Sequence, residues 1–145
     1  TPAFMAPEQV RGERGNIDRT TDVYALGVVL YQLITKSLPF RGRSSELYQK
    51  ILDTQPPPPR SLNSNIPASL EAICLKAMQK QSAQRYATAN ELALDLNRFL
   101  NGEVVQAYGK LDQRTIKRMV RRRFMAGVAA TLGAAAAGTM WILYQ

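Results

Sequence analysis

Apolar residues recur at helical spacing along the first hundred residues, which predicts a mainly α-helical fold. Over residues 67–80 the apolar positions lie three and four apart: Leu70, Ile73, Cys74, Ala77 and Met78. Over residues 88–100 they are Leu92, Leu96, Phe99 and Leu100, and over residues 45–53 they are Leu47, Ile51 and Leu52. This spacing is typical of a helix that packs one face on a core.

The helix predicted over residues 18–36 differs because it is apolar on nearly every side. Between Val23 and Leu33 the only strongly polar residue is Gln32. A helix of this kind belongs inside a larger body, so we expect neighbours on all its faces. Its apolar stretch is too short to span a bilayer. Gly27 costs a helix about 1 kcal/mol, which indicates a close packing contact at that position.

Turn and capping residues mark where these helices end. Thr88 and Glu91 fit a capping box, and Asn101-Gly102 is a typical helix stop. Residues 56–59 are four consecutive prolines, for which we predict an extended, exposed spacer. A ligand for a proline-recognition domain is the alternative interpretation of this segment. The pattern shows no convincing strand and no repeat.

Composition changes after residue 102 and divides the chain into three parts: residues 1–102, a linker over 103–123, and an uncharged segment over 124–144. Seven Lys and Arg but only one Asp lie in residues 110–123, which therefore hold six of the net charge of +8. Residues 1–102 are nearly balanced in charge. Because the excess charge adjoins an apolar segment, it favours a membrane surface of anionic lipids and argues against nucleic acid.

The segment from Phe124 to Tyr144 predicts a single transmembrane helix. Its 21 residues carry no charge. They would span about 32 Å as a helix, close to the roughly 30 Å hydrocarbon core of a bilayer. The preceding arginines predict that the N-terminal part is cytoplasmic. Small residues four apart, Ala130, Ala134 and Gly138, suit a homodimer through this helix.

Cysteine and histidine usage excludes some chemistry. The chain has one Cys and no His, so it can form no intrachain disulfide and perform no histidine-based acid–base catalysis. Cys74 lies on the apolar stripe of residues 67–80, which indicates a small core residue.

Four motifs in order resemble the C-terminal half of a Ser/Thr protein kinase domain. They are Ala6-Pro7-Glu8, Asp22 to Gly27, Leu38-Pro39-Phe40, and Arg85-Tyr86. Their order and spacing agree with the family, and their detail is similar to that of bacterial membrane-bound Ser/Thr kinases. The resemblance implies a helical C-terminal-lobe fragment of a protein-kinase-like fold over residues 1–102.

The resemblance also implies roles for individual residues. Thr1 matches a threonine that contacts the catalytic residues, and Pro2, Ala3, Phe4 and Met5 match the floor beneath the bound protein substrate. Glu8 and Arg85 match a buried ion pair that braces the lobe. Asp22 matches the anchor of the catalytic loop, although a carboxylate at a helix start is also a plain cap. Residues 81–84 depart from the family pattern, which puts the rigidity of the Arg85 approach in question.

The motifs that bind ATP and transfer phosphate are absent from these 145 residues. We find no Gly-rich G-x-G-x-x-G loop, no V-A-I-K, no H-R-D and no D-F-G. In family order they would precede Thr1. The resemblance therefore also implies that part of the usual cover of the apolar helix over residues 18–36 is missing. We therefore expect a fragment of a membrane-anchored Ser/Thr kinase that uses ATP and Mg²⁺ as the full-length protein, while this chain alone binds neither and is inactive. The alternative is a pseudokinase or membrane-tethered binding scaffold.

Overall fold

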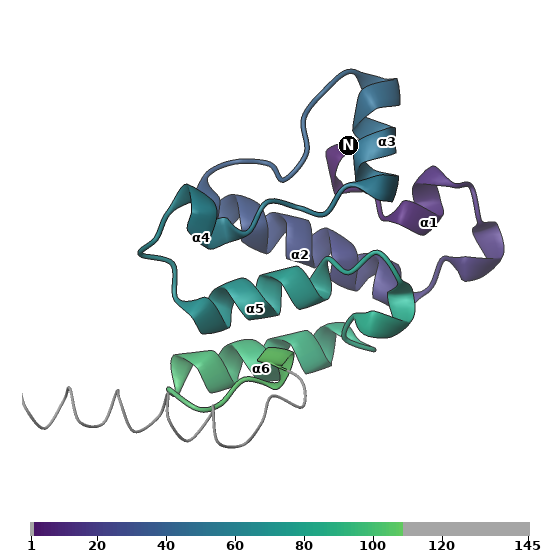
Figure 1. Ribbon diagram of the computed structural model, residues 1–145. Helices are drawn as coiled ribbons and strands as arrows, with labels where there is room; N and C mark the ends of the chain where they lie inside the picture. The colour runs from purple at the N-terminus through teal and green to yellow at the C-terminus, as the bar shows by residue number, and fades with distance from the viewer. Residues whose placement is uncertain (1, 109–145) are drawn as a thin grey trace, which may run out of the picture. The chain divides into compact units, whose positions relative to one another are not determined.

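Six α-helices follow one another through residues 2–108, the part of the chain that the computed structural model describes (Figure 1). They are α1 (Pro7–Val10), α2 (Arg19–Thr35), α3 (Ser44–Asp53), α4 (Pro59–Leu62), α5 (Ala68–Ala77) and α6 (Ala89–Leu100). Short 3-10 turns occur at Pro2–Phe4, Arg14–Asn16, Ser82–Gln84 and Gln106–Tyr108. The described residues contain no strand, so the mainly α-helical prediction is confirmed for this part of the chain.

The four predicted helices correspond to α2, α3, α5 and α6, and most of their ends agree within a residue. The α5 helix ends at Ala77, three residues before the predicted end. Sequence analysis missed α1 and α4, since each has only four residues and too few positions to show a period.

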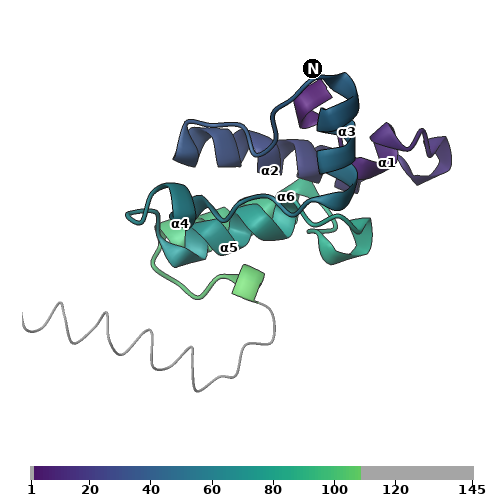
Figure 2. The same ribbon diagram turned by 45° about the horizontal axis from the view of Figure 1, so that its top comes forward.

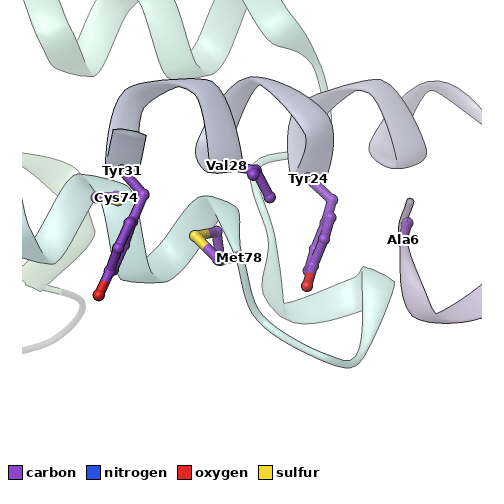
Figure 3. Packing of buried hydrophobic residues seen from close by; sticks show 6 residues of the cluster. All are labelled: Ala6, Tyr24, Val28, Tyr31, Cys74 and Met78. Atoms are coloured by element: carbon purple, nitrogen blue, oxygen red, sulfur yellow. The ribbon is translucent and has the colours of Figure 1, made fainter. Parts of the chain in front are cut away.

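The core lies where α2, α5 and α6 pack on one another. Figures 1 and 2 show α5 running alongside α2, with α6 packed against both. Tyr24, Val28 and Tyr31 of α2 face Cys74 and Met78 (Figure 3), which confirms Cys74 as a core residue. Burial raises the pKa of the Cys74 thiol to about 12, so the thiol stays protonated. A second cluster joins Val23, Ile73, Ala77, Tyr86, Leu92 and Val105.

Gly27 permits the close approach of α2 to the end of α5, as predicted. A Cβ at this position would lie 2.8 Å from Cγ of Met78 and 2.9 Å from Cβ of Ala77. Real Cβ atoms do not approach neighbours so closely, so glycine is the residue that this packing requires.

Side chains close the ends of α2 and α6. The Asp18 carboxylate accepts the Thr20 amide at 2.8 Å, which makes Asp18 the cap of α2. At α6 the Thr88 hydroxyl accepts the Glu91 amide at 3.2 Å. The Glu91 carboxylate accepts the amide of Ala87 rather than that of Thr88, so the predicted capping box forms one residue displaced.

Within the described lobe α2 is covered only in part, as expected for a chain that lacks some of the usual cover: Leu26, Val29 and Leu33 are exposed, Leu33 by 73%. Two expectations about packing were wrong. Leu100 is 75% exposed, since α6 ends there and turns away from the core. In the predicted exposed spacer, Pro56 and Pro59 are buried instead. The Tyr31 hydroxyl donates to the Pro57 carbonyl at 3.0 Å and holds this segment against α2.

The compact unit continues through Tyr108, past the predicted boundary at residue 102. Val105 is 2% exposed and belongs to the core, so residues 103–108 form part of the lobe and only the rest of the predicted linker follows it. Thr1, the basic residues 110–123 and the predicted transmembrane segment 124–144 lie outside the described residues. Among residues 2–108 no helix has the length and apolar character needed to cross a bilayer.

Candidate functional site

A buried ion pair between Glu8 and Arg85 occupies the junction of α1, α2 and the turn after α5. Nη1 of Arg85 lies 2.7 Å from Oε1 of Glu8, and Nη2 lies 2.8 Å from Oε2. Glu8 is 4% exposed and Arg85 is 5% exposed. This is a bidentate guanidinium–carboxylate pair, which fixes both distance and orientation.

The remaining donors of Arg85 bind backbone carbonyls from two other segments. Nε donates to the Gln79 carbonyl at 2.8 Å, and Nη2 also donates to the Lys80 carbonyl at 3.1 Å. Nη1 donates to the Thr20 carbonyl of α2 at 3.1 Å. With the two bonds to Glu8, all five N–H groups of the guanidinium have acceptors. One side chain therefore joins three parts of the lobe without an unsatisfied buried donor.

Glu8 is held as a carboxylate by its neighbours. Burial alone would raise its pKa, but hydrogen bonds from Arg85 and Thr21 outweigh burial and place the pKa below its ordinary value. The Thr21 hydroxyl donates to Oε1 at 2.8 Å. Sequence analysis missed Thr21, because nothing local distinguishes it from Thr20 beside it.

The Tyr24 ring packs against the guanidinium group of Arg85. The guanidinium carbon of Arg85 lies 5.0 Å from the centre of the Tyr24 ring, within the range of a cation–π contact. Burial raises the pKa of the Tyr24 hydroxyl far above its ordinary value. This hydroxyl is buried and has no hydrogen-bond partner among the described residues.

Residues 2–5 of the predicted substrate-side loop directly precede α1, the helix that contributes Glu8 to the ion pair. Pro2–Phe4 forms a 3-10 turn, closed by the Met5 amide donating to the Pro2 carbonyl at 3.1 Å. Ala3 is buried with Phe40, Leu47 and Ile51, and the half-buried Phe4 packs on the same cluster. The loop thus packs against α3 and Phe40 and continues into α1, the helix that carries Glu8.

Asp22 stands apart from this arrangement. It lies in the first turn of α2, but the cap of that helix is Asp18. Asp22 is exposed, and at helical spacing it continues the row of exposed residues Leu26, Val29 and Leu33. The structure therefore brings Glu8 and Arg85 together beside residues 2–5 and leaves Asp22 on an open face of α2.

The described residues offer no cluster of metal ligands. Within residues 2–108 no three His, Cys, Asp or Glu side chains lie close enough together to hold a metal ion.

Comparison with known families decides what this lobe is. A sequence model of the protein kinase domain matches residues 1–96. The chain belongs to the protein kinase family. The match includes both halves of the Glu8–Arg85 pair and the loop that precedes it.

Bacterial kinases are among its relatives. Serine/threonine-protein kinase PknB of Mycobacterium tuberculosis is 41% identical over 109 residues, which cover 74% of this chain and 17% of that protein. A probable serine/threonine-protein kinase PknB of Bifidobacterium longum is 38% identical over 72% of this chain and 15% of its own length. Tyrosine-protein kinase MasK of Myxococcus xanthus is 37% identical over 93% of this chain and 22% of its own length. The chain spans about a fifth of the length of these relatives.

Proposed function

We propose that this chain is the substrate-side part of the helical lobe of a membrane-anchored Ser/Thr protein kinase. The observation that carries the proposal is the attachment of residues 2–5 to the buried Glu8–Arg85 pair. A loop that must hold a protein substrate needs a rigid base, since misplacement of a substrate by 1 Å can cost about a hundredfold in rate. The match to the protein kinase domain supports the same interpretation.

In this proposal the chain positions the protein substrate, and other parts of the parent protein bind ATP and Mg²⁺. Residues 2–5 form the floor beneath the phosphoacceptor, Thr1 contacts the catalytic residues, and the Glu8–Arg85 pair holds the floor in place. The 145 residues contain no Gly-rich phosphate loop and no H-R-D sequence. The chain alone is therefore proposed to be inactive.

The exposed row on α2 fits this division of labour. A helix surface that stays in water seldom carries several large apolar side chains in a row. On α2 the exposed residues Leu26, Val29 and Leu33 form such a row. We propose that the catalytic part of the domain covers this face, with the Asp22 carboxylate at its end accepting backbone amides of the catalytic loop. The relatives are several times longer than this chain, and a parent of that size would have room for such a part.

The identity of the accepting hydroxyl separates two groups of relatives. Two relatives bear the name serine/threonine kinase, and MasK bears the name tyrosine kinase. We assign this chain to Ser/Thr transfer because Thr1 matches the threonine that the Ser/Thr family places beside its catalytic residues.

Membrane attachment is proposed from the sequence alone. The uncharged segment 124–144 would cross the bilayer once, and the basic residues before it would bind anionic lipid headgroups and keep the lobe in the cytoplasm. The small residues Ala130, Ala134 and Gly138 would allow two such helices to form a homodimer.

Phosphate transfer by the parent protein tests the assignment. The full-length protein and the 145-residue chain are each incubated with Mg²⁺, labelled ATP and peptides that offer Ser, Thr or Tyr. We expect transfer to Ser or Thr by the full-length protein only. Transfer to Tyr alone would reassign the substrate, and no transfer by a folded full-length protein would favour the binding scaffold.

A further inference from the structure

Asp95 of α6 is a fully buried carboxylate outside the site described above. It is 0% exposed. Oδ2 accepts the Tyr86 hydroxyl at 2.7 Å and the Ala107 amide at 2.8 Å. Oδ1 accepts the Gln106 amide and, at 3.3 Å, Nη1 of Arg98. Although burial alone would raise the pKa of Asp95, these donors place it below its ordinary value.

Two of the four donors come from the segment that leaves the lobe. We call residues 103–108 the strap. The Val105 side chain is buried in the cluster that contains Val23, Ile73 and Leu92. Apart from the Glu103 amide, two backbone amides of the strap donate hydrogen bonds to the rest of the described lobe, and both donate to Asp95. The strap is thus held by the buried Val105, by Ala107 and Tyr108, which pack on the same cluster, and by the Asp95 carboxylate.

The turn before the strap is the C-terminal cap of α6. Gly102 has φ of +73°, a left-handed conformation that glycine adopts at little cost. The Glu103 amide donates to the Arg98 carbonyl of α6 at 2.8 Å, so the strap beyond Glu103 can leave the core while this helix end keeps its hydrogen bonds.

We propose that the strap is a separate opening unit of the lobe and that Asp95 is its latch. When the strap is closed, the chain leaves the lobe at Tyr108. When it is open, the chain leaves at Glu103, and five further residues lengthen the connection by up to about 17 Å. Under the proposed membrane attachment, this length sets how far the kinase lobe stands from the bilayer.

Hydrogen exchange tests the latch on the 145-residue chain in detergent micelles, because the segment 124–144 is proposed to cross a bilayer. Three variants are compared with wild type. Val105→Ala removes buried volume, while Val104→Ala makes the same change at a neighbouring exposed residue. Gln106→Pro removes one backbone amide that donates to Asp95, at the first residue of the 3-10 turn Gln106–Tyr108.

We expect the Ala107 amide to be protected in wild type and to exchange about tenfold faster in Val105→Ala and in Gln106→Pro, the size expected from one lost contact. The amides of α2 should keep their rates, and Val104→Ala should match wild type. An unprotected Ala107 amide in wild type would overturn the proposal. So would variants that speed exchange equally in α2 and the strap, because the strap would then open only with the whole lobe.

The outcome of the hydrogen-exchange experiment does not depend on the proposed kinase activity. A full-length protein that transfers no phosphate would overturn the assigned function and leave the exchange pattern unchanged. A strap that never opens locally would overturn the latch and leave phosphate transfer unchanged.

Discussion

Arg85 and Glu8 lie 77 residues apart in the sequence and form a bidentate ion pair that is shielded from water on both sides. Such a pair gains little over a well-packed apolar contact as long as both partners are present. Its value lies in geometry, because planar groups joined at two points cannot rotate or slide. Here that geometry fixes α1, which directly follows residues 2–5 of the proposed substrate-side loop.

Replacement of the Arg85 side chain should therefore strongly lower the stability of the lobe. We expect Arg85→Ala to lower the free energy of unfolding by about 3–5 kcal/mol, since it leaves the Glu8 carboxylate buried without its partner. Urea unfolding followed by circular dichroism measures the loss. Arg85→Lys should recover only part of it, because an ammonium cannot replace the five donors of the guanidinium.

The matched control is Arg60→Ala on α4, where the residue is exposed. We expect a change within about 0.5 kcal/mol there. If Arg85→Ala and Arg60→Ala unfolded at the same urea concentration, the pair would not brace the lobe.

Local patterns predicted the four longer helices and the Thr88 cap, while contacts between distant segments had to come from the structure. The close contact at Gly27 was predictable because a glycine inside an apolar helix costs stability unless it permits close packing. Burial of Pro56 was not, since it depends on Tyr31 in another helix. The pairing of Glu8 with Arg85 came only through family resemblance. Asp95 could have been found, because it lies three residues after Leu92 on the buried side of α6.

Gly27→Ala should destabilise the lobe although alanine is the better helix former. Alanine gains about 1 kcal/mol in helix propensity, but its Cβ would collide with Met78 and Ala77. Overpacking of this kind costs about 1–3 kcal/mol, so we expect a net loss in the thermal unfolding temperature. Gly15→Ala is the control, because nothing lies within 4 Å of that position. A higher melting temperature for Gly27→Ala would show that α2 and α5 can move apart freely.

Two tyrosines on α2 should respond oppositely to loss of their hydroxyls. The Tyr24 hydroxyl is buried without a partner among the described residues, whereas the Tyr31 hydroxyl donates to the Pro57 carbonyl. We expect Tyr24→Phe to leave stability unchanged or raise it, and Tyr31→Phe to lower it by about 0.5–1.5 kcal/mol. Urea unfolding of both variants compares them directly. A clear loss from Tyr24→Phe would mean that its hydroxyl is bonded in solution.

Lys80 should make stability depend on pH in the alkaline range. Its ammonium donates to the carbonyls of Lys50 and Ile51 and lies 4.5 Å from the centre of the Phe40 ring. Burial, assisted by Arg85 and Arg11 and opposed by Asp53, lowers the pKa of Lys80 to about 8. In the unfolded chain the pKa is about 10.4. Between these values the unfolded chain binds more protons, so this group makes stability rise with pH from about 8 to 10.

The test measures urea unfolding of wild type and of Lys80→Met at several pH values between about 7 and 10. The folded and unfolded pKa values of Lys80 define this pH window. The buried thiol of Cys74 works in the opposite direction above about pH 9, because burial raises its pKa to about 12 while the unfolded thiol ionises. Since Cys74 is present in both proteins, the difference between them isolates Lys80. We expect wild type to gain stability relative to Lys80→Met as the pH rises through this window, and Lys36→Met, at an exposed residue, to follow wild type. A difference that stays constant with pH would mean that Lys80 keeps its ordinary pKa and that its ammonium is not desolvated in the fold.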